Sequence, residues 1–342
     1  MAELVGAYYM SHAGWCYRPI DAWAARSGER FPRADVPVDD LEVNRAKKDR
    51  MKAGFATLRE KVEEARPDVL VVFGDDQLEA FNFSNFPSFA VYVGEEFEGS
   101  LAGTLPGGDE PQLAGFEVTN GAGSGAGRRA RIPGHPDLSV AILSGLMKRG
   151  FDPAFCMDMP NPERGLGHAF MRPAESLTDL NLSIIPILMN LYYAPQVTAT
   201  RSFQLGQAIK ESIEEFPGDL RVGVVGSGGL WHTPGTKNAY LDEDFDAKTL
   251  AHLQAGDGRA MAQHFDSYQA PADDLSQQEG PRSRTVTGMP GSPGPQGGSR
   301  ETCAWIGAAG VSNGHAHTLI DYIPLYASPL GVAFAYWNQD EN

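Results

Sequence analysis

The feature that most constrains the fold is a run of five apolar residues, Val69–Phe73, followed at once by Gly74, Asp75, Asp76 and Gln77. A short, mostly β-branched apolar run predicts a strand buried on both faces, as in the parallel sheets of α/β proteins. In open sheets of this kind, ligands bind outside the carboxyl ends of the strands. The Gly-Asp-Asp sequence is equally typical of an ordinary turn, so the rest of the chain has to decide between these interpretations.

Other segments repeat the alternation of strand and helix. We expect further strands at 4–10, 87–93, 151–159, 182–188, 220–225 and 331–337, and helices at 41–66 (one or two), 135–148, 201–216, 246–268 and 301–309. Pro186 indicates an edge or a bulge in its strand, and the stretch around His168 resembles a loop. The pattern predicts a three-layer αβα fold with a mixed, largely parallel central sheet. We expect one catalytic domain over 1–342 with flexible inserts near 98–133 and 270–300, where Gly, Ser and Pro are frequent.

Charge and cysteine content narrow the class of protein. The formal net charge is −16, which argues against nucleic acid or an anionic membrane as a partner. The three cysteines have no CxxC spacing, so a disulfide framework or a thiolate zinc site is not expected. The first residues do not resemble a signal peptide, and no stretch approaches the about 20 apolar residues of a membrane span. We therefore expect a cytoplasmic protein.

Several polar residues follow expected strands. His12 comes after the first strand, Asp76 and Gln77 after the central one and His232 after a Gly-rich turn, while His168 lies between Gly165 and Gly167 on one side and Pro173 on the other. Two histidines and a carboxylate with open positions form the facial triad of non-haem Fe(II) oxygenases. Histidine is also suited to proton transfer near neutral pH. Each histidine could equally well be an ordinary core or surface residue.

Five segments resemble the class III extradiol ring-cleavage dioxygenases, the family of the protocatechuate 4,5-dioxygenase β subunit. They are SHAG at 11–14, VVFGDDQLEAFNFSNFPSFAV at 71–91, GLGHAFMRP at 165–173, GSGGLWH at 226–232 and GGSRETCAWIGA at 297–308. The resemblance implies that His12 and Glu301 are iron ligands. It implies that His232 is the acid/base and that His168 positions or protonates the substrate.

One position departs from the family. The resemblance places Gln77 where the family has its second histidine ligand. A glutamine carbonyl can bind a divalent metal, but it is a neutral and harder ligand than imidazole. We expect a centre of His12, Gln77 and Glu301, with Asp76 as an alternative to Gln77, and Fe(II) as the metal, although Mn(II), Mg(II) or another divalent ion would suit an oxygen-rich centre. Loss of the metal is the remaining alternative.

The resemblance implies a dioxygenase that opens the ring of a catechol-like diol with O2. Its partners would be an aromatic substrate and O2, and either a second copy of the chain or a small partner subunit. Two alternatives stay open: a non-catalytic or regulatory homologue, and a metal-dependent hydrolase or lyase on the same scaffold.

Overall fold

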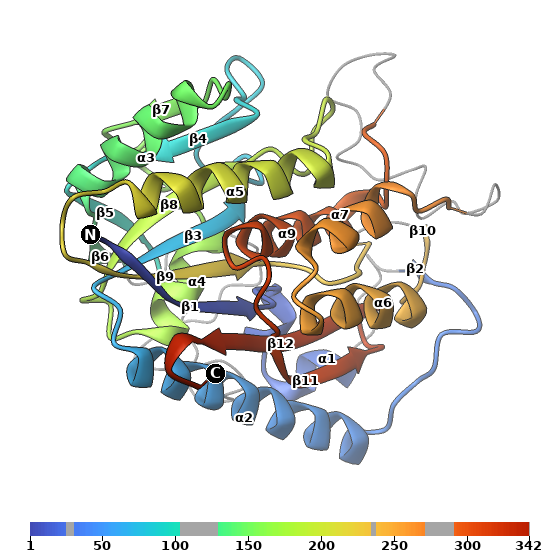
Figure 1. The fold of residues 1–342 in the computed structure, drawn as a ribbon. Helices are drawn as coiled ribbons and strands as arrows, with labels where there is room; N and C mark the ends of the chain where they lie inside the picture. The colour runs from blue at the N-terminus through green and yellow to red at the C-terminus, as the bar shows by residue number, and fades with distance from the viewer. Residues whose placement is uncertain (25–30, 103–128, 234–236, 271–290, 342) are drawn as a thin grey trace.

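The centre of the molecule is an eight-stranded mixed sheet in the order β11-β12-β1-β9-β3-β8-β4-β7 (Figure 1). The computed structural model describes residues 1–24, 31–102, 129–233, 237–270 and 291–341. Four neighbouring strands, β1, β9, β3 and β8, run parallel, whereas β12 is antiparallel to β1 and β4 to β8. The strands are β1 (Glu3–Met10), β3 (Val69–Asp75), β4 (Phe89–Tyr92), β7 (Ala154–Cys156), β8 (Ser183–Met189), β9 (Arg221–Ser227), β11 (Thr318–Leu325) and β12 (Leu330–Asn338).

Helices cover both faces of the sheet, which confirms the three-layer α/β prediction. Figure 1 shows α3 (Pro136–Lys148), α5 (Ala199–Glu214) and α9 (Thr302–Val311) along one side and α2 (Leu41–Ala65) along the other. The first layer also holds α7 (Gly258–Asp266), against which α6 (Glu243–Gln254) packs, and the second holds α1 (Ile20–Ala24) and α4 (His168–Leu177).

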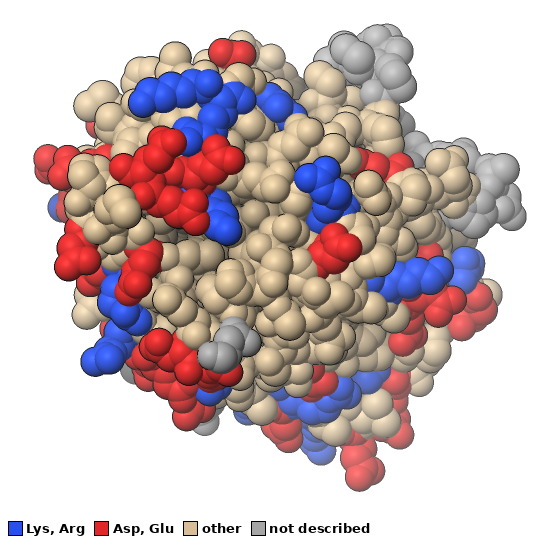
Figure 2. Space-filling view, viewed as in Figure 1, with Lys and Arg blue, Asp and Glu red and all other residues tan. Residues whose placement is uncertain are grey.

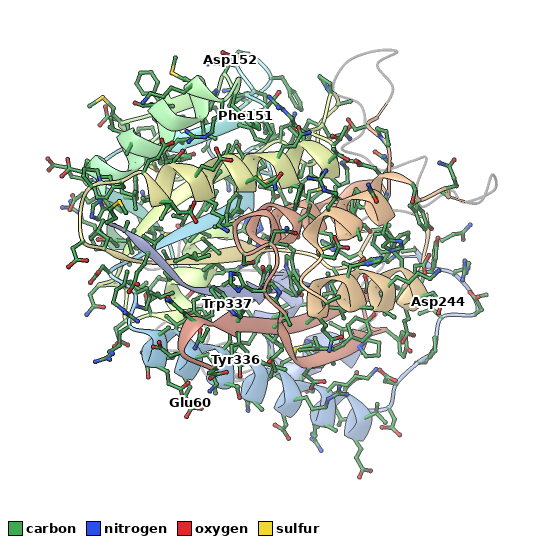
Figure 3. All side chains as sticks on the ribbon, viewed as in Figure 1. Glu60, Phe151, Asp152, Asp244, Tyr336 and Trp337 are labelled. Atoms are coloured by element: carbon green, nitrogen blue, oxygen red, sulfur yellow. The ribbon has the colours of Figure 1, made fainter. Side chains whose placement is uncertain are left out.

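Strand β3 shows why helices must pack on both faces of the sheet. Val71 and Phe73 point into the core beneath α5 and α9, while Leu70 and Val72 point into the core beneath α2 and α4. Successive side chains of a strand alternate between faces, so a continuous apolar run needs an apolar layer on each side. Side chains fill the space between the sheet and both helical layers (Figure 3).

The segment 41–66 forms one helix rather than two. The Asp40 carboxylate accepts a hydrogen bond from the Val43 N–H at 2.8 Å, a standard N-terminal cap. The helix ends where Arg66 turns into the left-handed region with φ 46°. The helical prediction over 246–268 is divided into α6 and α7, with a break at Gly256, which has φ 70°.

Two expectations were wrong. The stretch at His168 is helical, not a loop: α4 begins at His168, and Pro173 lies inside it. Pro186 was expected at an edge or a bulge, but β8 lies between β3 and β4, and its pairing with both neighbours has no register shift. It tolerates Pro186 because the β4 ladder reaches only Ile187, one residue short of the proline.

The sequence interpretation also missed β11, a partly buried edge strand that contains Pro324. The remaining short elements are β2 (Phe31–Pro32), β10 (Lys237–Ala239), η1 (Gly14–Tyr17), η2 (Gly297–Glu301) and η3 (Gln339–Glu341).

The two expected inserts lie largely outside the described residues. The described ends of the first insert form β5 (Glu96–Ser100) and β6 (Arg129–Pro133), which pair antiparallel as a ribbon separate from the main sheet. Of the second insert, the part described from residue 291 leads into η2.

On the face shown in Figure 2, acidic and basic side chains lie next to each other, with a row of basic side chains near the top of the view above a group of acidic ones. Among the described helices, none has the length and apolar character needed to cross a bilayer.

Candidate metal centre and active site

The candidate site lies where β1, β9 and β3 end side by side. His12 follows β1, Ser227 is the last residue of β9 and Asp75 is the last residue of β3. Glu301 reaches the same place from η2, directly before α9. The structure therefore brings His12 and Glu301 together, as the sequence analysis expected, with 3.4 Å between His12 Nε2 and Glu301 Oε2.

A chain of hydrogen bonds fixes the tautomer of His12. Pro173 has no N–H to donate to the carbonyl of Ala169, four residues earlier in α4. Ser227 Oγ donates to that carbonyl instead, at 2.6 Å. The hydroxyl has one proton, so it accepts from His12 Nδ1, which lies 2.8 Å away. Nδ1 therefore carries the hydrogen, and Nε2 presents its lone pair.

His12 is neutral in this environment. Burial lowers its pKa to about 3, against the raising effect of Glu301. Its Nε2 is buried and has no hydrogen-bond partner in the described part of the chain. A neutral imidazole whose other nitrogen is held by a hydrogen bond is the form that ligates metals.

Glu301 is buried and has contacts on both carboxylate oxygens. Oε1 accepts from the Tyr192 hydroxyl and from Gln77 Nε2 at 3.1 Å, and Oε2 accepts from the Gly229 N–H at 3.1 Å. Burial alone would raise its pKa, but His232 and His12, together with the hydrogen bonds, hold the pKa well below its usual value. Glu301 is therefore ionised.

The chain approaches Glu301 closely at Gly228. Its φ is 123°, and a Cβ there would lie 2.8 Å from Glu301 Cβ and 3.2 Å from His12 Cε1. Only glycine satisfies both the backbone conformation and the space at this position.

Asp75 lies on the third side of this space. Its side chain is buried, with Oδ1 3.6 Å from His12 Nε2. Neither oxygen has a partner that meets hydrogen-bond geometry among the described residues. Burial, and next the charge of Glu301, raise its pKa well above the usual value, while the nearby Gln77 amide lowers it.

The other two residues of this turn have different surroundings. The carboxylate of Asp76 accepts from the backbone N–H groups of Glu79, Ala80 and Phe81 at 2.8–3.0 Å. Asp76 therefore holds the turn together, and the alternative that it replaces Gln77 at the metal finds no support. Gln77 does reach the site, where its amide nitrogen also lies 3.2 Å from the Tyr192 hydroxyl.

His232 borders the same carboxylate. Its Nδ1 donates to the carbonyl of Leu230 at 3.0 Å, because a carbonyl can only accept. Nε2 is directed to Glu301 Oε1 at 3.4 Å. With Nδ1–H donated to Leu230, Nε2 is the nitrogen that can accept a proton, and the neighbouring Glu301 carboxylate would stabilise the imidazolium that results.

His168 is the fourth predicted residue, and its ring centroid lies 4.8 Å from that of His12. Its Nδ1 is 2.6 Å from Glu79 Oε2, which also accepts from the His168 backbone N–H. Burial would raise the pKa of Glu79, but His168 and Arg172 lower it to about 2. The ionised Glu79 orients His168 and leaves Nε2 for another partner.

Asp75 was not proposed as a site residue from the sequence, and neither were Glu79, Arg172, Tyr192 and Ser227. Tyr192 and Ser227 follow or end β8 and β9, so the rule that ligands gather at carboxyl ends could have indicated both. Arg172 donates to the carbonyl of His12 and lies over the Tyr17 ring. No sequence pattern pointed to Glu79 or Arg172, because each acts through a contact between distant segments.

The residues fit a divalent metal. One ligand atom from each of His12, Asp75 and Glu301 lies within 4.8 Å of the others, and all three residues are buried. Unpaired lone pairs on His12 and Asp75 meet at this point together with an ionised Glu301, and one cation would satisfy all of them.

Comparison with known families agrees with this geometry. Residues 37–282 match the model described as the catalytic LigB subunit of aromatic ring-opening dioxygenase. The chain belongs to the LigB family. The match confirms the resemblance seen in the sequence, and it includes the positions of Gln77, His168 and His232. His12 and Glu301 lie outside the matched residues, and the fold places them beside His232 and His168.

Curated relatives share part of the chain. A gallate dioxygenase of Pseudomonas putida is 34% identical over 35% of this chain and 35% of its own length. A 2,3-dihydroxyphenylpropionate/2,3-dihydroxicinnamic acid 1,2-dioxygenase of Escherichia coli is 26% identical over 54% of this chain and 50% of its own. The matches thus span half or less of these relatives. A solved structure of an uncharacterized Escherichia coli K12 protein covers 97% of this chain and 99% of its own at 12% identity and a TM-score of 0.42.

Proposed function

We propose that the protein is an extradiol-type dioxygenase that opens the ring of a catechol-like diol with O2 at a non-haem Fe(II) centre. The observation that carries this proposal is the meeting of His12 Nε2 and Glu301 Oε2 at 3.4 Å beside His232 and His168. Membership of the LigB family supports the reaction class. The two named relatives act on aromatic diols or triols that bear a carboxylate, so such diols are the first substrates to test.

The metal would be held by His12, Glu301 and a third ligand from the turn 75–77, where the sequence predicts Gln77. Bound Fe(II) would supply a centre that brings the diol oxygens and O2 together and allows electrons to pass between them. Mn(II) would fit the same oxygen-rich surroundings.

The protein groups supply the proton chemistry. His232 Nε2 takes a proton from a diol hydroxyl as general base, because its Nδ1 is already donated to Leu230. The neighbouring Glu301 carboxylate stabilises the resulting imidazolium. His168, whose Nδ1 is held by Glu79, would accept a proton at Nε2 from the second diol hydroxyl and return it to the oxygenated product. The product is a ring-opened semialdehyde.

The test is an oxygen-electrode assay of anaerobically purified, Fe(II)-loaded protein with a panel that includes catechol, gallate and 2,3-dihydroxyphenylpropionate. The proposal expects one O2 consumed per diol and a new visible absorption from the ring-opened product. Turnover without O2 consumption would indicate a hydrolase or lyase instead. Binding of a phenol by metal-free protein without turnover would indicate a regulatory homologue.

We also propose that the protein is cytoplasmic and that it associates with a partner chain. We expect a homo-oligomer or a complex with a small subunit, which size-exclusion chromatography with light scattering would distinguish from a monomer.

A further inference from the structure

We propose that Asp75, rather than Gln77, is the third protein ligand, so that one imidazole and two carboxylates hold the metal. This inference rests on the proposed function only in taking a divalent cation to bind between His12 and Glu301. It differs from the ligand set expected from the sequence, in which Gln77 occupied the third position.

The first argument is that the surroundings of the Asp75 side chain are energetically unfavourable without a cation. Its side chain is 0% exposed, and both oxygens lack a partner in hydrogen-bond geometry within the described residues. Burying a carboxylate without compensation is strongly unfavourable. No arginine or lysine in the described structure forms an ion pair with it, and its nearest basic group is His12 Nε2 at 3.6 Å, which is itself unpaired. A cation between these atoms removes both deficits at once.

The second argument is the direction of the Gln77 amide. Gln77 is only partly buried, and its Nε2 donates to Glu301 Oε1 at 3.1 Å. A group that donates a hydrogen bond to a ligand carboxylate orients that ligand, and the atom of Gln77 that faces Glu301 is the amide nitrogen, not the carbonyl oxygen that would bind a metal. Together with Tyr192, this nitrogen occupies Oε1, whereas Oε2 faces His12. Gln77 is therefore a positioning residue for Glu301.

The third argument excludes the remaining member of the turn. The oxygens of Asp76 accept three backbone N–H groups, so rotation toward the metal would leave three buried donors unpaired. Asp75, the residue that ends β3, is the member of the turn whose oxygens are available.

This ligand set changes the chemistry of the centre. Two carboxylates neutralise a divalent ion, and hard oxygen ligands suit Mn(II) and Mg(II) better than an imidazole-rich site does. We therefore expect the protein to bind Mn(II) readily, and Mn(II) is the probe for the test.

The experiment is a Mn(II) titration of metal-stripped protein, in which the EPR signal of free Mn(II) reports the Kd. We compare the wild type, Asp75→Asn, Gln77→Ala and the control Asp179→Asn, an acid with 73% of its side chain exposed at the opposite end of the sheet. Loss of a direct ligand should weaken binding by about 100-fold or more, and loss of an orienting group by about 10-fold. Asp179→Asn should bind as the wild type does.

A second readout guards against variants that fail to fold. Metal-free Asp75→Asn should have a Tm at or above that of the wild type, because the variant removes a buried acid whose oxygens have no hydrogen-bond partner, while the rise in Tm on adding Mn(II) should be lost. Asp75→Ser should give the same loss of the Mn(II) response if Asp75→Asn does not fold.

The proposal is overturned if Asp75→Asn binds Mn(II) like the wild type, if Gln77→Ala loses more affinity than Asp75→Asn, or if the wild type does not bind Mn(II). Wild-type protein that binds Mn(II) through Asp75 but cleaves no diol with Fe(II) would refute the proposed function and leave the ligand assignment standing.

Discussion

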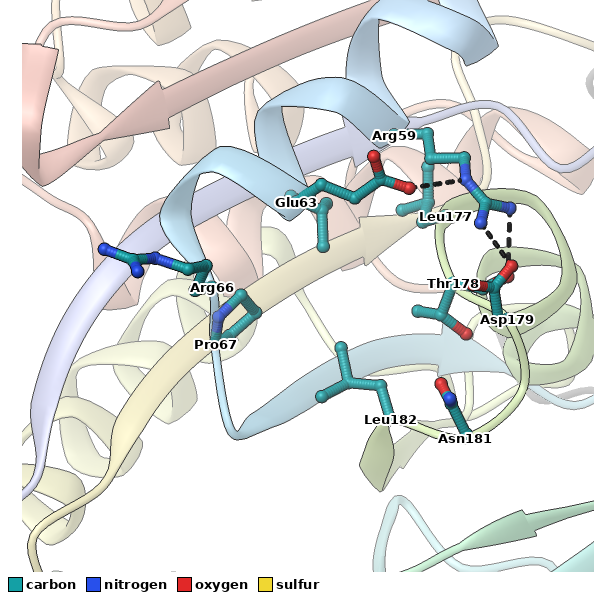
Figure 4. A pocket seen from close by; sticks show the side chains of 10 residues that line it. Arg59, Glu63, Arg66, Pro67, Leu177, Thr178, Asp179, Asn181 and Leu182 are labelled. Atoms are coloured by element: carbon teal, nitrogen blue, oxygen red, sulfur yellow. Dashed lines mark hydrogen bonds and ion pairs between the residues drawn. The ribbon is translucent and has the colours of Figure 1, made fainter.

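The acidic side chains at the two ends of the parallel strands differ in burial and in their partners. At the carboxyl ends, Asp75 and Glu301 are buried and face histidines. At the amino ends lies a pocket of about 150 Å³ lined by Arg59, Val62, Glu63, Arg66, Pro67, Leu177, Thr178, Asp179, Asn181 and Leu182 (Figure 4). There Arg59 pairs with Glu63 at 2.9 Å and also with Asp179, and both acids are mostly exposed.

The two ends differ in whether their charged groups are exposed and already paired, and this difference indicates which end can bind a ligand. Ion pairs in water contribute little to stability and leave no lone pair unsatisfied. A buried acid without a hydrogen-bond partner, such as Asp75, destabilises the fold unless a ligand is added. Hence the small pocket at the amino ends, where Arg59 already pairs with two acids, is not our candidate site.

The largest effect should come from His232→Ala. Loss of the general base should reduce turnover by roughly 10²–10⁴-fold, while the Kd for Mn(II) stays close to that of the wild type. Steady-state O2 consumption and the Mn(II) titration measure the two quantities separately. If metal is lost in parallel with turnover, His232 is a ligand and the division of roles at this end of the sheet is wrong.

Ser227→Ala tests the chain of hydrogen bonds that prepares His12. Without the hydroxyl that accepts from Nδ1, the imidazole loses its fixed tautomer, and the Kd for Mn(II) should rise about 10- to 100-fold. Ser212→Ala is the matched control, because Ser212 also donates to a helix carbonyl but lies in α5 and outside the site. Equal affinities for both variants would show that Ser227 does not position the ligand.

Asp246→Asn tests the buried acid behind the His232 turn. Asp246 accepts from the Trp231 N–H at 2.9 Å and the Tyr322 hydroxyl at 2.9 Å, and burial raises its pKa to about 8. Below about pH 4 the carboxyl is protonated in both the folded and the unfolded chain. Between there and pH 8 only the unfolded chain releases the proton, so the free energy of unfolding should fall by up to about 1.4 kcal/mol per pH unit.

Urea unfolding of the wild type and of Asp246→Asn between pH 5 and about pH 8 measures this dependence. The variant should have the flatter pH profile. Identical slopes would show that Asp246 is ionised in the folded protein across this range.

The smallest effect should come from Arg59→Ala at the amino ends. Its partners are exposed, so the free energy of unfolding should change by less than about 1 kcal/mol, with no change in the Kd for Mn(II). Urea unfolding and the Mn(II) titration check both. A large loss of metal affinity would mean that the two ends of the sheet are coupled, and the contrast drawn above would fail.

The sequence by itself predicted the layers of this protein. The apolar runs of β3 and β9 can be stable only if both faces are covered, and this requirement is local and readable from composition. The resemblance named His12, His168, His232 and Glu301, and all four gather at the carboxyl end of the sheet. The prediction that Gln77 ligates the metal stays a prediction, since only a metal titration tests it.

The tertiary structure decided the rest, because it depends on contacts between segments far apart in the chain. Pro173 suggested a loop in the sequence, but it lies within α4. Because proline has no N–H, the Ala169 carbonyl accepts a hydrogen bond from Ser227 instead. The same Ser227 hydroxyl orients His12. Likewise, nothing local distinguishes Asp75 from Asp76. Backbone N–H groups of the following turn donate to the Asp76 carboxylate. The Asp75 side chain faces His12 and Glu301 without a hydrogen-bond partner among the described residues. Which lone pairs remain unpaired is a property of the whole fold, and this is why the available ligand atoms could be recognised only in three dimensions.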